Sequence, residues 1–158
     1  KVNNHRRRPA AYKNLLLAES GHLICNHSTT HGDMSKISDI EAFKKELAGV
    51  EDVYREATGK ELSKYFRPPE GKFSEQTLEF AEELGYTTVF WSLAYADWDN
   101  NNQMSPEKAK ALVLSRVHNG CVLLLHPTSA TNAAILEDLI TELSKEGYRF
   151  GTPDEFCA

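Results

Sequence analysis

The sequence has little of what marks a membrane protein, a disulfide-rich protein or a nucleic-acid-binding protein. Its longest apolar run, residues 121–125, is far shorter than the ~20 residues that a membrane-spanning helix requires. It has three cysteines, an odd number without C-x-x-C spacing, and Cys25 and Cys121 lie in apolar runs typical of small buried thiols. The formal net charge is −5, and the one basic cluster, residues 5–8, is short and terminal, so nothing indicates a nucleic-acid partner.

What remains is the composition of an ordinary globular protein. Apolar residues form 41% and charged residues 26% of the 158 positions, which excludes a disordered tail, a collagen-like fibre and a simple coiled coil. This length matches one domain, and no linker, repeat or low-complexity stretch divides it. We therefore predict a single domain over residues 1–158. The N-terminal residues do not resemble a secretory signal, because residues 15–17 are too short an apolar region.

Short apolar runs alternate with helical patterns along the chain, which is typical of βα units and a largely parallel sheet. Ser38 and Glu41 have the spacing of a capping box at the start of the second helix. The predicted helices are residues 9–20, 38–59, 74–85, 105–119 and 131–145. The predicted strands are residues 22–25, 65–66, 86–93, 121–125 and 148–150. We therefore predict one α/β domain.

Side chains capable of catalysis or metal binding follow four of the predicted strands. They are His27 and His31 after the first strand, Arg67 after the second, Asp97 after the third and His126 after the fourth. Because the carboxyl ends of parallel strands lie at one edge of a sheet, we expect these side chains to share that edge. His27 and His31 are four residues apart, so on a helical turn their rings would face the same way and could share a cation.

Each of these residues also has an ordinary structural interpretation. The histidine pair fits a surface or core coincidence, and His126 fits a hydrogen-bonded structural histidine. Arg67, held extended by the prolines that follow it, fits a salt bridge, and Asp97 fits a turn cap. The combination favours function, because four independent coincidences at successive strand ends are improbable.

Four motifs in this order resemble those of the polysaccharide deacetylases, the NodB-homology domain or carbohydrate esterase family 4. They are H-S-T-T-H at 27–31, R-P-P-E-G-K-F at 67–73, D-W at 97–98 and L-L-L-H at 123–126. The resemblance extends from about Gly21 to the C-terminus. Residues 73–75, 89–92, 101–103 and 125–133 further resemble one subgroup, the δ-lactam-forming muramic acid de-N-acetylases, which trim the peptidoglycan of the spore cortex.

The resemblance implies a distorted (β/α) barrel that hydrolyses the N-acetyl group of an amino sugar, with a peptidoglycan strand as partner. It also implies an extracytoplasmic location, at the cell wall or spore cortex. His27 and His31 would hold a divalent metal such as zinc or cobalt, which would activate a water. His126 would be the general acid, its charged form favoured by Asp97, and Arg67 would orient the base carboxylate.

The same resemblance assigns residues to the substrate. Pro69, Gly71 and Phe73 of the arginine motif would line the binding groove. Trp98 and Leu123 would wall the slot that holds the acetyl group.

One motif of the family is absent from this sequence. The T-F-D-[DN]-G strand, which supplies the base and a third metal ligand, has no counterpart here, so we expect a chain that lacks the first strand and helix. Two imidazoles hold a catalytic metal poorly, which predicts weak or no activity for this chain. An exposed sheet edge would also favour self-association.

Two alternatives remain at this point. The chain could be a degenerate, non-catalytic module that binds glycan. It could instead be a metal-independent hydrolase that pairs His126 with Ser92 or Ser129, although no G-x-S-x-G motif supports that chemistry.

Overall fold

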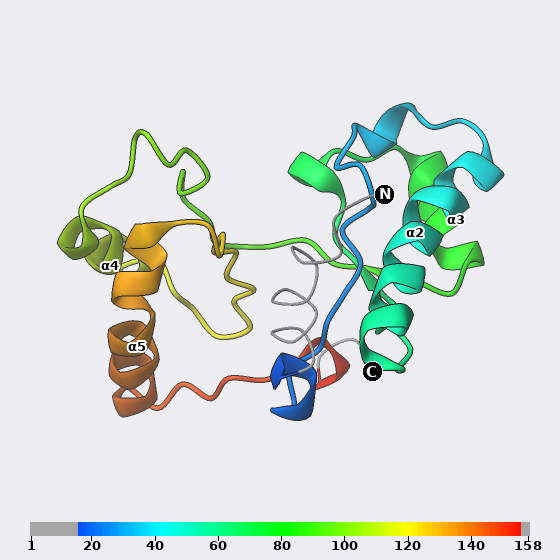
Figure 1. Cartoon of the computed structure of the whole chain (residues 1–158). Helices are drawn as coiled ribbons and strands as arrows, with labels where there is room; N and C mark the ends of the chain where they lie inside the picture. Colours follow the sequence, from blue (N-terminus) through cyan, green and yellow to red (C-terminus); the bar gives the residue numbers. More distant parts are fainter. Residues whose placement is uncertain (1–15, 156–158) are drawn as a thin grey trace, which may run out of the picture. The chain divides into compact units, whose positions relative to one another are not determined.

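The computed structural model describes residues 16–155, which belong to two compact units (Figure 1). Of the described residues, 16–90 and 152–155 belong to the first unit, and Trp91–Gly151 is the second unit. Within the described part of the chain, no helix is both long enough and apolar enough to cross a membrane.

The first unit is organised around the amphipathic helix α2, Ile40–Thr58. Its N-cap is Asp39, whose carboxylate accepts a hydrogen bond from the Ala42 amide at 2.9 Å. The predicted capping box of Ser38 and Glu41 is therefore wrong, because the N-cap is Asp39, one residue after Ser38, and its carboxylate bonds the Ala42 amide. The helix ends as predicted at Gly59, whose φ of 70° is the left-handed conformation that glycine adopts without a steric penalty. Of the predicted helix 9–20, residues 16–19 are helical and residues 9–15 lie outside the described part.

A parallel two-stranded sheet lies beside this helix. Strands β1 (Tyr65–Phe66) and β2 (Thr87–Thr88) pair in register, joined by α3 (Glu75–Glu83), which begins at a capping box of Ser74 and Thr77. The predicted strand 22–25 is wrong in extent, because parallel pairing reaches β1 only as an isolated bridge from Asn26 to Phe66. The predicted strand 86–93 is similarly reduced to β2 and a bridge at Leu93, since the prolines that follow β1 cannot donate to a longer ladder.

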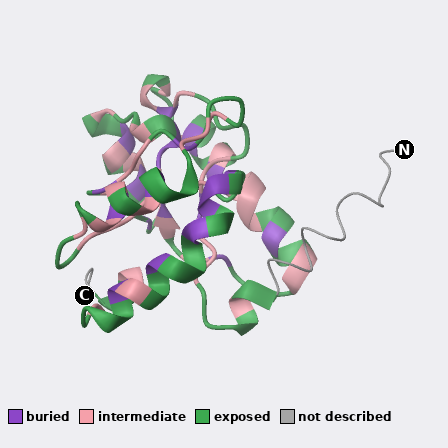
Figure 2. Ribbon diagram, turned by 90° about the vertical axis from the view of Figure 1, so that its left-hand side faces the viewer, coloured by how far each residue is buried: buried purple, intermediate pink, exposed green. Residues whose placement is uncertain are grey.

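The core of the first unit lies between α2, α3 and this sheet. Its buried members are Met34, Phe43, Leu47, Phe66, Ala81 and Tyr86. The ribbon of the helices alternates buried and exposed segments, as amphipathic helices do (Figure 2). Three short 3-10 helices complete the described elements: η1 (Met34–Lys36), η2 (Pro69–Gly71) and η3 (Pro153–Glu155).

The second unit is built on a helix pair. Helices α4 (Pro106–Leu114) and α5 (Ala130–Lys145) bury Ala109, Val113, Ile135 and Leu139 against one another. The structure confirms the helix predicted over 131–145, whereas α4 ends earlier than the predicted residue 119. The hydroxyl of Ser115 donates to the Leu112 carbonyl at 2.9 Å, an alternative to continuing the helix.

The last two predicted strands are reduced or absent. Residues 121–125 form only a bridge from Leu123 to Leu93, and residues 148–150 form no strand, since no ladder pairs with them in the described chain.

Candidate functional site

The histidine motif lies in a loop that leaves the bridge at Asn26. The rings of His27 and His31 meet edge to face, with centroids 4.9 Å apart and planes at 84°. No helical turn forms there, so the expectation that a helix aligns the two rings is wrong. Ser28 (φ 63°) and His31 (φ 56°) instead adopt left-handed backbone, which is uncommon outside glycine. A bent loop therefore brings the rings together.

A hydrogen bond to the backbone of Arg67, the first residue of the R-P-P-E-G-K-F motif, sets the tautomer of His27. Its Nδ1 lies 2.6 Å from the carbonyl oxygen of Arg67. Because a carbonyl only accepts, Nδ1 carries the proton and the lone pair is on Nε2. A metal-binding histidine is usually held in this way by a backbone or carboxylate acceptor.

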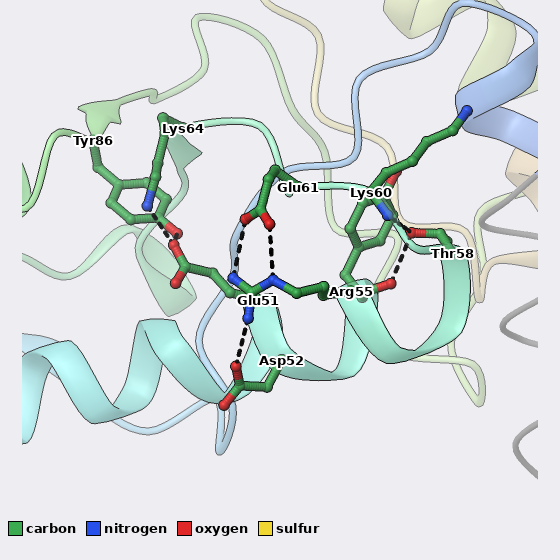
Figure 3. Close-up of polar contacts among 9 residues, drawn as sticks. Glu51, Asp52, Arg55, Thr58, Lys60, Glu61, Lys64 and Tyr86 are labelled. Carbon is green, nitrogen blue, oxygen red and sulfur yellow. Dashed lines mark hydrogen bonds and ion pairs between the residues drawn. The ribbon is translucent and has the colours of Figure 1, made fainter.

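Asn26 anchors the start of the loop from within the core. It is 1% exposed, accepts a hydrogen bond from the Ser28 amide at 3.0 Å, and donates to the Leu47 carbonyl at 2.9 Å and the Tyr86 hydroxyl at 3.0 Å. The Tyr86 hydroxyl in turn donates to Glu51, which also pairs with Lys64 (Figure 3). Burial, and then the hydrogen bond with Glu51, raises the pKa of Tyr86, so this hydroxyl remains a donor.

The arginine motif turns sharply after β1. Arg67 is half-buried, and burial lowers the pKa of its guanidinium from the ordinary value. Pro69 is buried in η2, while Glu70 (φ 55°) and Gly71 (φ 68°) take successive left-handed conformations that reverse the chain. Phe73 follows, about half exposed, with its ring 5.1 Å from that of Phe90.

In the second unit, the structure brings together Asp97 and His126. The Asp97 carboxylate lies 2.6 Å from His126 Nδ1 and accepts the His126 amide at 2.7 Å. The Asp97 side chain is 1% exposed, whereas the His126 side chain is 30% exposed. Burial alone would raise the pKa of Asp97, but hydrogen bonds from His126 and Asn132 outweigh it and hold that pKa below its usual range. An ionised Asp97 therefore fixes the proton of His126 on Nδ1.

A second layer of hydrogen bonds surrounds this pair. Asn132 donates to Asp97 and to the His126 carbonyl, and accepts from the Tyr95 hydroxyl. The hydroxyl of Ser129 donates to Gln103 at 2.5 Å and caps α5 through the Asn132 amide. Gln103 and Asn132 occur in the sequence patterns noted above, but their support of the pair was missed because no local spacing indicates it.

The serine hypothesis gains no support from these contacts. Ser129 is engaged by Gln103 and by the helix cap, and the Ser92 hydroxyl accepts from the Val122 amide at 3.1 Å. The ring of His126 is held by Asp97.

The two residues assigned to the acetyl slot differ in exposure. Trp98 is 66% exposed, and Leu123 is half-buried, packed against the core of the second unit. Their contact with substrate remains a prediction.

The imidazoles of His27 and His31 could provide two ligands of a metal site. Among residues 16–155 no group of three or more histidine, cysteine or acidic side chains could hold a metal ion. A catalytic zinc usually has three protein ligands. His27 and His31 would supply two nitrogen ligands, and a third protein ligand would have to come from another residue.

Comparison with known proteins finds relatives that match most of this chain. A family model described as polysaccharide deacetylase matches residues 3–89. The chain is 42% identical over 139 residues to an uncharacterized 30.6 kDa protein of Geobacillus stearothermophilus. It is 40% identical over 139 residues to the peptidoglycan-N-acetylmuramic acid deacetylase PdaA of Bacillus subtilis. Each match covers 88% of this chain and 52% of the relative, so the chain spans about half the length of these curated relatives.

Solved structures agree on the fold. Bacillus subtilis PdaA, a family 4 carbohydrate esterase, has a TM-score of 0.86 at 38% identity, covering 92% of this chain and 62% of that one. A family 4 pseudoenzyme from Bacillus anthracis has a TM-score of 0.80 at 23% identity, covering 92% and 50%, and shows the fold alone. These matches confirm the predicted α/β fold class, that of NodB-type (β/α) barrel enzymes, and the predicted resemblance to family 4 esterases, muramic acid deacetylases among them.

Proposed function

The chain belongs to the polysaccharide deacetylase family, and from that premise we propose that it is part of a metal-dependent hydrolase that removes acetyl groups from peptidoglycan amino sugars. The observation that carries the proposal is the histidine pair, 4.9 Å apart, with His27 Nδ1 tied to the Arg67 carbonyl. The two units, on this proposal, are parts of one deacetylase domain. The products are acetate and a free amine on the sugar.

The metal site would use Nε2 of His27 together with the imidazole of His31. When bound, a divalent ion such as zinc or cobalt supplies Lewis acidity to the acetyl carbonyl and to an attacking water. The hydrogen bond from His27 Nδ1 to Arg67 orients the ring and makes it a better ligand. The half-buried Arg67 guanidinium would orient the carboxylate that acts as base.

His126 would supply the proton that the leaving amine needs. Asp97 holds the Nδ1 proton, so the proton given to the amine would come from Nε2. Because hydrogen bonds from His126 and Asn132 hold the pKa of Asp97 below its usual range, Asp97 stays ionised when His126 gives up this proton.

The substrate would be a peptidoglycan strand, and the target sugar N-acetylmuramic acid. The 40% identity to a muramic acid deacetylase supports that choice. Pro69, Gly71 and Phe73 would line the glycan groove, and Trp98 and Leu123 the acetyl slot. Such a substrate lies outside the cell membrane, so the enzyme would act at the cell wall or the spore cortex.

Zinc titration by calorimetry tests the metal site. We expect the chain to bind one Zn²⁺ ion, His27→Ala to abolish binding, and His22→Ala, at an exposed histidine of the same unit, to leave it intact. Absence of binding in a folded wild-type chain would exclude the metal-dependent proposal for these residues. Equal losses in both variants would indicate non-specific binding.

Acetate release separates the deacetylase from a non-catalytic glycan-binding module. We expect slow, zinc-stimulated acetate release from peptidoglycan, removed by His126→Ala. Glycan binding with no acetate released at saturating zinc would favour the non-catalytic alternative.

A further inference from the structure

We propose that Glu46 of α2 is a positioning residue that fixes the backbone between His27 and His31, so that both imidazoles reach one metal ion. This inference rests on the proposed function, since it concerns the same metal site. Glu46 is 15 residues beyond the motif, and no local spacing in the sequence connects the two.

The contacts between Glu46 and the loop are numerous and specific. One carboxylate oxygen accepts the amides of Thr29, at 3.1 Å, and Thr30, at 2.9 Å. The other accepts the Thr30 hydroxyl at 3.1 Å, and the Thr29 hydroxyl donates to the Glu46 backbone carbonyl at 2.8 Å. Thr29 and Thr30 are the middle residues of the five-residue motif, so this one glutamate holds its centre.

The loop needs such a clamp because its conformation is unfavourable by itself. Left-handed backbone at Ser28 and His31 brackets the two threonines. The hydroxyl of Ser28 accepts the His31 amide at 3.0 Å, which fixes only the end of the loop. Without Glu46, two consecutive amides in the middle would lose their side-chain acceptor, and the bend between the rings would relax.

Gly49 provides a second point of contact on the same face of α2. A Cβ atom added there would lie 2.3 Å from the Thr29 hydroxyl oxygen and 3.3 Å from its Cβ. The loop therefore rests directly on the helix, one turn beyond Glu46. The Glu46 carboxylate is occupied by three donors, which assigns it to holding the loop and not to binding the metal.

The test compares Glu46→Ala with wild type in the whole chain by NMR and by zinc calorimetry. Alanine has neither carboxylate oxygen, so E46A leaves the Thr29 and Thr30 amides and the Thr30 hydroxyl without their side-chain acceptor. We expect faster amide hydrogen exchange at Thr29 and Thr30 and loss of the NOE between the two imidazole rings. We also expect the zinc affinity to fall by about tenfold, which is typical when a residue that positions a metal ligand is removed. Glu41→Ala is the matched control, since Glu41 lies on the same helix, exposed, and pairs only distantly with Lys44 at 3.8 Å.

The NMR readout distinguishes failure of this inference from failure of the proposed function. Persistence of the ring-to-ring NOE in E46A would overturn the inference, whatever the zinc affinity. Its loss in E46A but not in E41A would support the inference. A wild-type chain that shows the NOE and binds no zinc would count against the proposed function alone.

Discussion

The histidine loop of the first unit and the Asp97–His126 pair of the second unit are organised in opposite ways. The loop is largely exposed, and its conformation is maintained by backbone amides that bond to Glu46, Asn26 and the Ser28 hydroxyl. The pair is built on a carboxylate that is 1% exposed and saturated by side-chain and backbone donors.

This difference matches the chemistry proposed for each region. A metal ligand must present a lone pair toward an ion, so the loop needs correct placement and can remain exposed. A general acid needs a fixed tautomer, which a buried, ionised carboxylate provides. The pair should therefore depend on charge and burial, and the loop on shape.

The largest effect is expected from removing the buried carboxylate. Asp97→Ala leaves the His126 amide and the Asn132 side chain without their acceptor, and should lower the free energy of unfolding of the second unit by about 3 kcal/mol. Both tryptophans, Trp91 and Trp98, belong to this unit, so urea denaturation followed by tryptophan fluorescence reports on it selectively.

The matched control for that variant is Asp138→Ala. Asp138 is in the same unit but on the surface, paired with Lys110 at 3.2 Å and 65% exposed, so its loss should cost less than about 1 kcal/mol. Equal effects of the two variants would contradict the view that burial makes the pair stable.

The same carboxylate predicts a pH dependence. The pKa of Asp97 is lower in the folded chain than in the unfolded chain, where it is about 3.9, so its contribution is complete above that value and is lost as the pH falls through the lower folded pKa. Acid should therefore destabilise the second unit of wild type more than that of Asp97→Asn. Parallel stability curves for the two chains, measured by tryptophan fluorescence in urea between neutral and acid pH, would refute this assignment.

The loop should also respond to added volume on the face of α2 that it contacts. In the middle of a helix, Gly→Ala normally stabilises by up to about 1 kcal/mol, but Gly49→Ala places a methyl group 2.3 Å from the Thr29 hydroxyl. We expect a net loss of about 1–2 kcal/mol, measured by urea denaturation with circular dichroism. In a Thr29→Ala background, Gly49→Ala should become neutral or stabilising. If it still lowers the stability there, the Thr29 hydroxyl is not the cause of the clash.

How far the sequence predicts the structure depends on the range of the interactions. Helices α2, α3 and α5 were predicted because apolar periodicity and the glycine that ends α2 are local signals, although the N-cap of α2 was placed at Ser38 instead of Asp39. The strands were predicted too long, because an apolar run does not reveal whether the strand that should pair with it has backbone N–H groups to donate. Pro68, just beyond β1, has none, so pairing with β2 stops there.

The site divides in the same way. His27, His31, Asp97 and His126 could be selected from motifs, and the structure pairs them two by two. The residues that hold them could not be selected, because Glu46 acts on a loop 16 and 17 residues away and Asn132 on an aspartate 35 residues away. Such contacts depend on tertiary packing, which no short window of sequence contains.

The smallest effect apart from the Asp138→Ala control is expected from Ser129→Ala, which also tests what the pair does. The variant removes the N-cap of α5 and the hydrogen bond to Gln103, at a cost of about 1 kcal/mol in the stability of the second unit. If His126 acts as a general acid, acetate release by the zinc-loaded protein should persist, because Ser129 takes no part in the reaction. Loss of acetate release with the second unit still folded would contradict that expectation. The Ser129 hydroxyl would then be needed either in the reaction itself or to place Asn132 beside Asp97.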